Sequence, residues 1–179
     1  PPTPGGAAGF SSTGRRYTEV RTMSTQNPPL RRTPRRVLFL CTGNFYRSRF
    51  AEAVFNHHAP NHLPGHMPGW TAFSRGLAIH LAEGDLSPYT AEALEQRGIP
   101  LHHTAPSRQP LEEQDLEAAH LVIALDAEEH QPMVAARFPD WEERITFWDV
   151  ADTHLVTPEA ALPAIEQEVL ALLRRLAED

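Results

Sequence analysis

The chain has 179 residues, of which 41% are hydrophobic, and a formal net charge of −7. This is enough apolar material for a single folded domain. Its one cysteine excludes an internal disulfide framework and a zinc cluster built from cysteines. No segment approaches the run of about 18 apolar residues that a membrane helix needs. We find no secretory signal pattern and therefore expect a cytoplasmic protein that does not bind membranes.

The charge is unevenly distributed along the chain. Every basic residue is Arg, and residues 1–36 hold seven of the 16 against one acidic residue, Glu19. Residues 37–179 therefore carry nine Arg and 22 acidic side chains, a net charge of −13. Such an acidic body argues against a nucleic-acid-binding protein. An anion site here must be made locally, from Arg side chains and backbone N–H groups.

Residues 1–34 are rich in Pro, Gly, Ser and Thr. A segment of this composition cannot bury enough apolar surface to offset its ordering entropy, and we predict that it is disordered. Met23 resembles a natural start, so the residues before it can also be an artefact of start-site choice. A basic tail that touches a membrane or nucleic acid is the functional alternative. The folded domain is predicted over residues 35–179.

From residue 36 onward, strand-like and helix-like segments alternate along the chain. Alternation of this kind predicts an α/β fold: a single domain with a four-stranded parallel sheet and helices on both faces. The acidic run 112–117 is interpreted as a solvated turn. The predicted elements are strands at 36–40, 70–74, 119–126 and 144–150, and helices at 49–58, from Ser87-Pro88 to Gly98, at 127–137, and from Pro158 to the C-terminus.

The segment after the first strand reads CTGNFYRS, residues 41–48. Ligands of open parallel sheets bind beyond the C-terminal ends of the strands. Thr42 to Arg47 form a short loop that opens into a helix near Ser48, and a helix N-terminus with free N–H groups binds anions. Gly43 and Asn44 tolerate the left-handed backbone that such a loop needs. Cysteine thiols in these surroundings are readily deprotonated and nucleophilic.

Two side chains complete the predicted site. Arg47 can bind two phosphate oxygens through its planar guanidinium. Ser48 can donate a hydrogen bond to the Cys41 sulfur. The predicted phosphate-binding residues are Thr42, Gly43, Asn44, Phe45, Tyr46, Arg47 and Ser48. The alternative, an inert buried thiol, does not explain this combination of residues.

The stretch VLFLCTGNFYRSRFAEAVF resembles the phosphate-binding loop of the low-molecular-weight protein-tyrosine phosphatases, whose signature is Cys-x-Gly-Asn-x-Cys-Arg-Ser-Pro followed by an Ala-Glu-Ala helix. The resemblance covers roughly residues 36–176. It implies that Cys41 attacks phosphorus to form a phosphocysteine, while Arg47 and the loop amides stabilise the equatorial oxygens. It further implies that an aspartate protonates the leaving group and then activates water. We expect neither a metal nor another cofactor.

The general acid is one of two aspartates in FWDVADTH. The family places an apolar residue two positions before the acid, and this pattern favours Asp152 over Asp149. Thr153 stands where the family usually has proline. The family's paired tyrosines after the acid are missing, so Phe45, Tyr46 and residues 77–80 are the candidates for the aromatic wall of the pocket.

Three further positions depart from the family signature. Tyr46 replaces its second cysteine, so an oxidised Cys41 has no partner for a rescuing disulfide. Arg49 replaces a proline and Arg75 an alanine, and both are interpreted as solvated surface residues or as part of the site rim. A metal site built from His57, His58, His62 and His66 is disfavoured, because Pro60 and Pro64 are expected to break the helix.

These observations predict a phosphomonoesterase that hydrolyses phosphotyrosine, in a protein or in a small aryl phosphate, and that is a monomer or a weak dimer. Two alternatives stay open. The same loop can bind arsenate, and an arsenate reductase with one cysteine would need an external thiol. A non-catalytic anion-binding regulatory domain would retain the loop without turnover.

Overall fold

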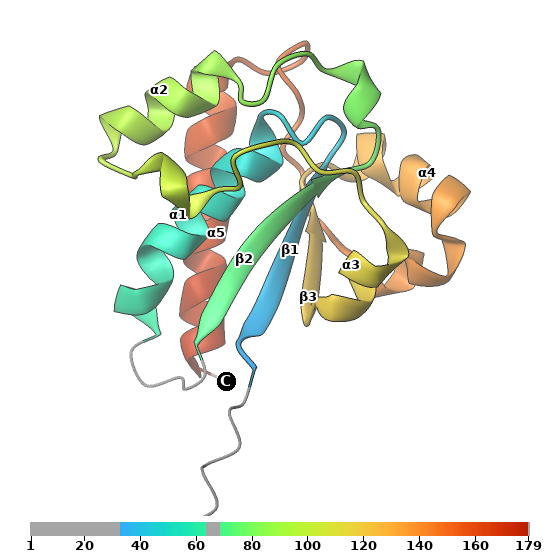
Figure 1. Cartoon of the computed structure of the whole chain (residues 1–179), viewed down its shortest axis with the longest axis horizontal. Coiled ribbons are helices and arrows are strands. Elements are labelled where there is room, and N and C mark those ends of the chain that lie inside the picture. The colour runs from blue at the N-terminus through green and yellow to red at the C-terminus, as the bar shows by residue number, and fades with distance from the viewer. Residues whose placement is uncertain (1–32, 64–68, 179) are drawn as a thin grey trace, which may run out of the picture. The chain divides into compact units, whose positions relative to one another are not determined.

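A computed structural model describes residues 33–63 and 69–178. Four parallel strands form one sheet in the order β2-β1-β3-β4 (Figure 1). The strands are β1 (Arg35–Cys41), β2 (Trp70–Gly76), β3 (Leu121–Ala124) and β4 (Thr146–Phe147). The predicted α/β class, the four-stranded parallel sheet and the position of Cys41 at the end of the first strand are confirmed.

The helices cover both faces of this sheet. Figure 1 shows α1, α2 and α5 on one face and α3 and α4 on the other. Their bounds are α1 (Arg47–His62), α2 (Pro88–Gln96), α3 (Glu113–Ala118), α4 (Ala127–Arg137) and α5 (Pro158–Glu178). Short 3₁₀ helices lie at η1 (Ile79–Leu81), η2 (Leu101–His103) and η3 (Pro139–Arg144).

Strand β1 is buried on both faces and separates two hydrophobic cores. Val37 and Phe39 pack into the core under α1, α2 and α5, whereas Leu38 and Leu40 pack into the core under α3 and α4. Successive side chains of a strand point to opposite faces, which is why a continuous apolar run forms the central strand of such a sheet. The C-terminal end of β1 is thereby held rigidly in the middle of the sheet.

Some predicted boundaries are wrong. Residues 113–118 form a helix rather than a turn, because the side chains of Glu112 and Asp115 form a capping box at its N-terminus. Helix α1 continues through Pro60 to His62, since a proline in the last turn removes only one intrahelical hydrogen bond. The last strand was predicted over residues 144–150 but comprises only Thr146–Phe147. It begins later than predicted because η3 extends to Arg144.

The predicted disordered tail falls almost entirely on residues 1–32, which lie outside the described residues, as does His66. The tail therefore remains a prediction. None of the described helices is both long enough and apolar enough to span a membrane.

Candidate functional site

The loop between β1 and α1 turns its carbonyl groups outward. The carbonyls of Cys41, Thr42 and Phe45 accept hydrogen bonds from backbone N–H groups of residues 77, 78 and 87, at 2.8–2.9 Å. Among the turn, loop and cap hydrogen bonds of the described residues, none has a backbone N–H group of residues 42–47 as its donor. These amides surround the N-terminus of α1, where unpaired donors and the helix dipole favour an anion.

Asn44 fixes the shape of this loop. Its φ of 49° is the left-handed conformation predicted from its type. The side-chain Oδ1 accepts from the Gln109 backbone N–H at 2.8 Å, and Nδ2 donates to Ser48 Oγ at 3.1 Å and to Ser74 Oγ at 2.8 Å. Gly76 must lack a side chain here, because a Cβ atom would lie 3.0 Å from Asn44 Cβ and 2.6 Å from Ile79 Cγ2.

Gly43 serves the loop differently from the prediction. It does not take a positive φ. A Cβ atom at this position would instead approach Ala82 Cβ to 2.8 Å, so the glycine is needed for close contact between two loops.

The sulfur of Cys41 lies under this loop and is only slightly exposed, with 3% of the residue's surface accessible. Ser48 Oγ lies 3.0 Å from Sγ. Because Ser48 Oγ already accepts from Asn44 Nδ2, its own hydrogen is free to point at the sulfur. The structure thus brings Cys41 and Ser48 together in the geometry expected from the sequence.

Arg47 is almost completely buried and is surrounded by acceptors. Its Nη1 donates to the Val150 carbonyl at 3.0 Å, and its Nη2 donates to Glu129 Oε2 at 2.7 Å and to Asp152 Oδ2 at 3.1 Å. Burial alone would lower the pKa of Arg47, but Cys41, Asp152 and Glu129 outweigh it and raise that pKa. The guanidinium is therefore a permanent cation beside the sulfur.

The two candidate acids lie in different surroundings. Asp152 contacts Arg47 and lines the same cavity as Cys41, and its Oδ1 accepts from the Thr153 N–H at 2.7 Å. Asp149 is exposed and lies between Trp148 and Val150, which both pack into a core. Asp149 does not line the cavity. The geometry favours Asp152, as the sequence pattern did.

Glu129 is a site residue that the sequence analysis missed. Besides its contact with Arg47, it accepts a hydrogen bond from Thr42 Oγ1. Burial raises the pKa of Glu129, but the bond from Thr42 and the charge of Arg47 outweigh burial and lower it. The sequence indicates only the general position: Asp126 follows the third strand and caps α4, so the first turn of α4 lies at the same sheet edge as Cys41, but no sequence pattern identifies Glu129 as the partner of Arg47.

A cavity of about 300 Å³ opens above the sulfur. Its walls include Phe45 and Tyr46, as predicted, and also Tyr89 from α2, which was not. Tyr46 and Tyr89 meet edge to face with ring centroids 6.5 Å apart. Burial, followed by the nearby Asp152 carboxylate, raises the pKa of Tyr46 to about 12. The predicted wall at residues 77–80 is wrong, because Leu81 and Ala82 line the cavity instead.

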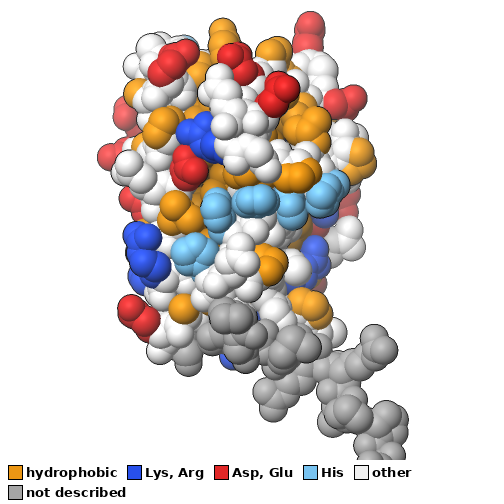
Figure 2. Space-filling model, turned by 90° about the vertical axis from the view of Figure 1, so that its left-hand side faces the viewer, with side chains coloured by type: hydrophobic (Ala, Val, Ile, Leu, Met, Phe, Trp, Pro, Cys, Tyr) orange, Lys and Arg blue, Asp and Glu red, His pale blue; other side chains and the backbone are white. Residues whose placement is uncertain are grey.

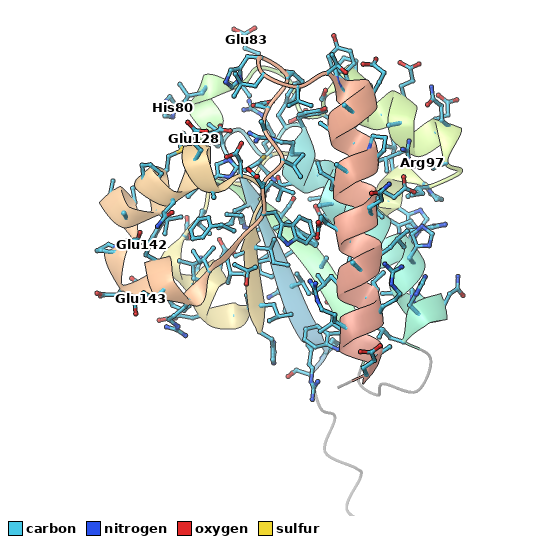
Figure 3. All side chains as sticks on the ribbon, turned by 180° about the vertical axis from the view of Figure 1, so that it is seen from behind. His80, Glu83, Arg97, Glu128, Glu142 and Glu143 are labelled. Carbon is cyan, nitrogen blue, oxygen red and sulfur yellow. The ribbon has the colours of Figure 1, made fainter. Side chains whose placement is uncertain are left out.

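The outer edge of this cavity is acidic. Glu83 lines it next to Leu81 and Ala82, and Figure 3 shows Glu83 pointing away from the sheet at the end of the molecule where the strands terminate. The lining of the cavity thus combines apolar and aromatic side chains with the Arg47 cation and with the carboxylates of Glu83 and Asp152.

The remaining candidates lie elsewhere. Arg75 pairs with Asp115 at 2.9 Å on the face covered by α3. Arg49 is neither at the rim nor solvated, since only 1% of its surface is exposed. Figure 2 shows a band of histidines on one face of the protein. The contacting rings belong to His57, His58, His62, His102 and His103. In residues 33–63 and 69–178, no three or more His, Cys, Asp or Glu residues form a group that could hold a metal ion.

A parallel sheet whose first strand ends in a cysteine, followed by five loop residues and an arginine that opens a helix, defines a cysteine-dependent phosphatase-type hydrolase. The sequence model of the family described as low molecular weight phosphotyrosine protein phosphatase matches residues 36–179. The chain therefore belongs to this family.

Individual relatives agree with this assignment. A curated protein-arginine-phosphatase from Bacillus subtilis (strain 168) is 30% identical over 110 residues, which are 61% of this chain and 67% of that protein. The solved low molecular weight protein tyrosine phosphatase from T. tengcongensis is 28% identical, with a TM-score of 0.63, over 80% of this chain and 98% of that one. The YwlE arginine phosphatase from Geobacillus stearothermophilus is 30% identical, with a TM-score of 0.60, over 81% and 92%.

Proposed function

We propose that this protein hydrolyses phosphotyrosine, in a protein or in a small aryl phosphate, through a phosphocysteine intermediate. The observation that carries the proposal is that Cys41, Arg47 and Asp152 line one cavity whose walls include Phe45, Tyr46 and Tyr89. The aromatic walls fit a planar aryl group, which aromatic side chains bind by stacking or edge contacts. The loop amides and Arg47 provide the donors for a phosphate.

In the first step, the Cys41 thiolate attacks phosphorus in line with the tyrosyl oxygen. The P–O bond to tyrosine breaks, and Asp152 gives its proton to the departing oxygen. The N–H groups of residues 42–47 and the Arg47 guanidinium stabilise the charge on the equatorial oxygens. Ser48 stabilises the thiolate through the contact of 3.0 Å between Oγ and Sγ.

In the second step, the Asp152 carboxylate takes a proton from water, and the water oxygen attacks phosphorus. The P–S bond breaks, the Cys41 thiolate is restored, and inorganic phosphate leaves. Asp152 ends the cycle protonated, as it began. Its distance of 3.1 Å from Arg47 keeps it beside the phosphate in both steps.

A second candidate substrate is phosphoarginine in proteins. It is supported by the relative from Bacillus subtilis, which is named a protein-arginine-phosphatase. Against it, the Phe45 and Tyr89 side chains leave mainly apolar walls around the cavity, whereas a guanidinium requires acceptors for its several donors. The carboxylates at the cavity, Asp152 and Glu83, are the groups that such a substrate would have to use.

The test compares kcat/KM of the wild type on matched phosphotyrosine and phosphoarginine peptides, with Cys41→Ser as the inactive control. We expect the phosphotyrosine peptide to be the better substrate and Cys41→Ser to abolish its hydrolysis. A preference for the phosphoarginine peptide would reverse the substrate assignment. Phosphate binding without turnover of either peptide would instead indicate a regulatory domain, and arsenate-dependent oxidation of an external thiol would indicate a reductase.

A further inference from the structure

Arg49 is a cation buried two residues after Arg47, and it takes no part in the steps described above. A buried guanidinium is costly unless its donors are satisfied. Here Nε donates to Thr104 Oγ1 at 2.7 Å, Nη1 donates to the Asp85 carbonyl at 2.9 Å, and Nη2 donates to the Ala105 carbonyl. Its charge is matched by Glu52, whose Oε2 lies 4.0 Å from Nε. All three nitrogens are thus engaged inside the protein.

The first consequence of these contacts concerns the cavity wall. The Asp85 carbonyl belongs to the segment between η1 and α2, and Glu83 and Ser87 on either side of it line the cavity. The Ser87 N–H also donates to the Phe45 carbonyl at 2.9 Å. Arg49 therefore ties the wall segment to α1, the helix that carries the phosphate loop.

The second consequence is a chain of hydrogen bonds that ends at the nucleophile. Glu52 Oε2 accepts from Thr104 Oγ1 at 2.8 Å and from Ser74 Oγ at 2.6 Å. Ser74 Oγ in turn accepts from Asn44 Nδ2, which also donates to Ser48 Oγ beside the sulfur. Because the hydrogen of Ser74 points at Glu52, its lone pairs face Asn44.

This direction holds only while Glu52 is ionised. A neutral carboxylic acid would donate its own proton to Ser74 or Thr104 and compete for the lone pairs that Asn44 or Arg49 uses. Burial is the largest influence on the pKa of Glu52 and leaves it raised, although the hydrogen bonds from Ser74 and Thr104, and then the charge of Arg49, act in the opposite direction.

We propose that Arg49 is a positioning residue. Through its contacts with Thr104 and Glu52 it holds the hydrogen-bond chain through Ser74 and Asn44, which orients Ser48 toward Cys41, and through the Asp85 carbonyl it ties the cavity wall to the phosphate loop. The inference rests on the proposed function for its kinetic part. The family signature has proline at the position of Arg49. The contacts of this arginine are therefore a property of this chain and do not follow from the signature.

The test uses three variants that separate charge from contact. Arg49→Met/Glu52→Met removes both buried charges and, with them, the oxygen that accepts from Ser74 and Thr104, and removing both charges is far less disruptive to folding than removing one. Arg49→Lys keeps the cation but lacks the planar guanidinium that reaches three acceptors. Arg97→Met is the matched control, since Arg97 pairs with Glu166 at 2.7 Å between α2 and α5, away from the site (Figure 3).

Four quantities are measured for each variant: the melting temperature, kcat and KM on p-nitrophenyl phosphate, and the rate of Cys41 alkylation by iodoacetamide against pH. For Arg49→Met/Glu52→Met, we expect kcat/KM to fall by roughly 10- to 100-fold. Its half-maximal alkylation should move to higher pH by about one unit, because Ser48 no longer donates to the thiolate.

For Arg49→Lys, we expect the pH dependence of alkylation to match that of the wild type and KM to be raised. For Arg97→Met, we expect both the alkylation profile and KM to be unchanged. Wild-type kinetics and alkylation in the folded double variant would overturn the proposal, as would an unchanged KM for Arg49→Lys if the double variant does not fold. If the wild type itself fails to hydrolyse the substrate, the proposed function fails, whereas the alkylation profiles still test the role of Arg49.

Discussion

Replacing Asp152 by asparagine tests the assignment of the general acid most directly. Asparagine retains the size of the side chain and the oxygen that accepts from the Thr153 N–H at 2.7 Å, but it cannot deliver a proton. Proton transfer by a positioned side chain contributes about 10²- to 10⁴-fold to a rate, which corresponds to about 3–5 kcal/mol of activation free energy at 1.36 kcal/mol for each factor of ten.

The size of the loss should depend on the leaving group. A phosphotyrosine peptide releases a basic oxygen that needs the proton, so kcat for Asp152→Asn should fall by the full amount. p-Nitrophenolate leaves readily without a proton, so its kcat should fall much less. KM should not rise for either substrate, because the variant removes a negative charge 3.1 Å from Arg47 Nη2.

Asp149→Asn is the control, because Asp149 is exposed and outside the cavity. Its kcat should equal that of the wild type on both substrates. The assay is steady-state kinetics on the two substrates with all three proteins. Equal losses on both substrates for Asp152→Asn, or a larger loss for Asp149→Asn, would refute the reasoning.

Three other outcomes follow from the site. Because Cys41 is the only thiol in the chain, prolonged peroxide should inactivate the enzyme beyond recovery by dithiothreitol; regained full activity would count against this. Glu129→Gln removes a charge 2.7 Å from Arg47 but retains an acceptor, so inorganic phosphate should inhibit this variant at lower concentrations than the wild type, and weaker inhibition would contradict the role given to Glu129. Burial, and then the Arg47 cation, lowers the pKa of His130 to about 4. As the pH falls, His130 is protonated in the unfolded chain before it is protonated in the folded protein. Its contribution to the free energy of unfolding is therefore complete above about pH 6.5, and about 3 kcal/mol of it is lost by about pH 4. Urea unfolding across this range should show a weaker pH dependence for His130→Asn than for the wild type or for the variant of exposed His80, His80→Asn; identical profiles would exclude this contribution.

The parts of the site that are local in the sequence could be predicted from it. The apolar run before Cys41, the glycine and asparagine after it and Arg47 six residues on lie within one strand, one loop and one helix start. Their types already dictate a loop with inward N–H groups. The positive φ of Asn44 and the contact of Ser48 with the sulfur follow from the same few residues.

The parts that depend on tertiary contacts could not be predicted. Glu129 reaches Arg47 only because β3 lies beside β1 in the sheet, and Tyr89 reaches Tyr46 only through the packing of α2. Arginine is usually found at protein surfaces, and no local sequence pattern indicates that Arg49 is buried with three acceptors around its guanidinium. Helix α3 was missed because Glu112 is not among the common N-cap residues.

The charges of the site indicate where its affinity for phosphate originates. Arg47 contacts the carboxylates of Glu129 and Asp152 and lies 3.8 Å from that of Asp126, so its positive charge is largely balanced before a substrate arrives. A phosphate dianion must therefore be attracted mainly by the N–H groups of residues 42–47. When Asp152 carries the proton that the first step requires, one of these anions is removed from Arg47. Protonation of Asp152 and binding of the phosphate thus favour each other. As a result, Asp152 carries the proton for the leaving group when a phosphate is bound in the loop.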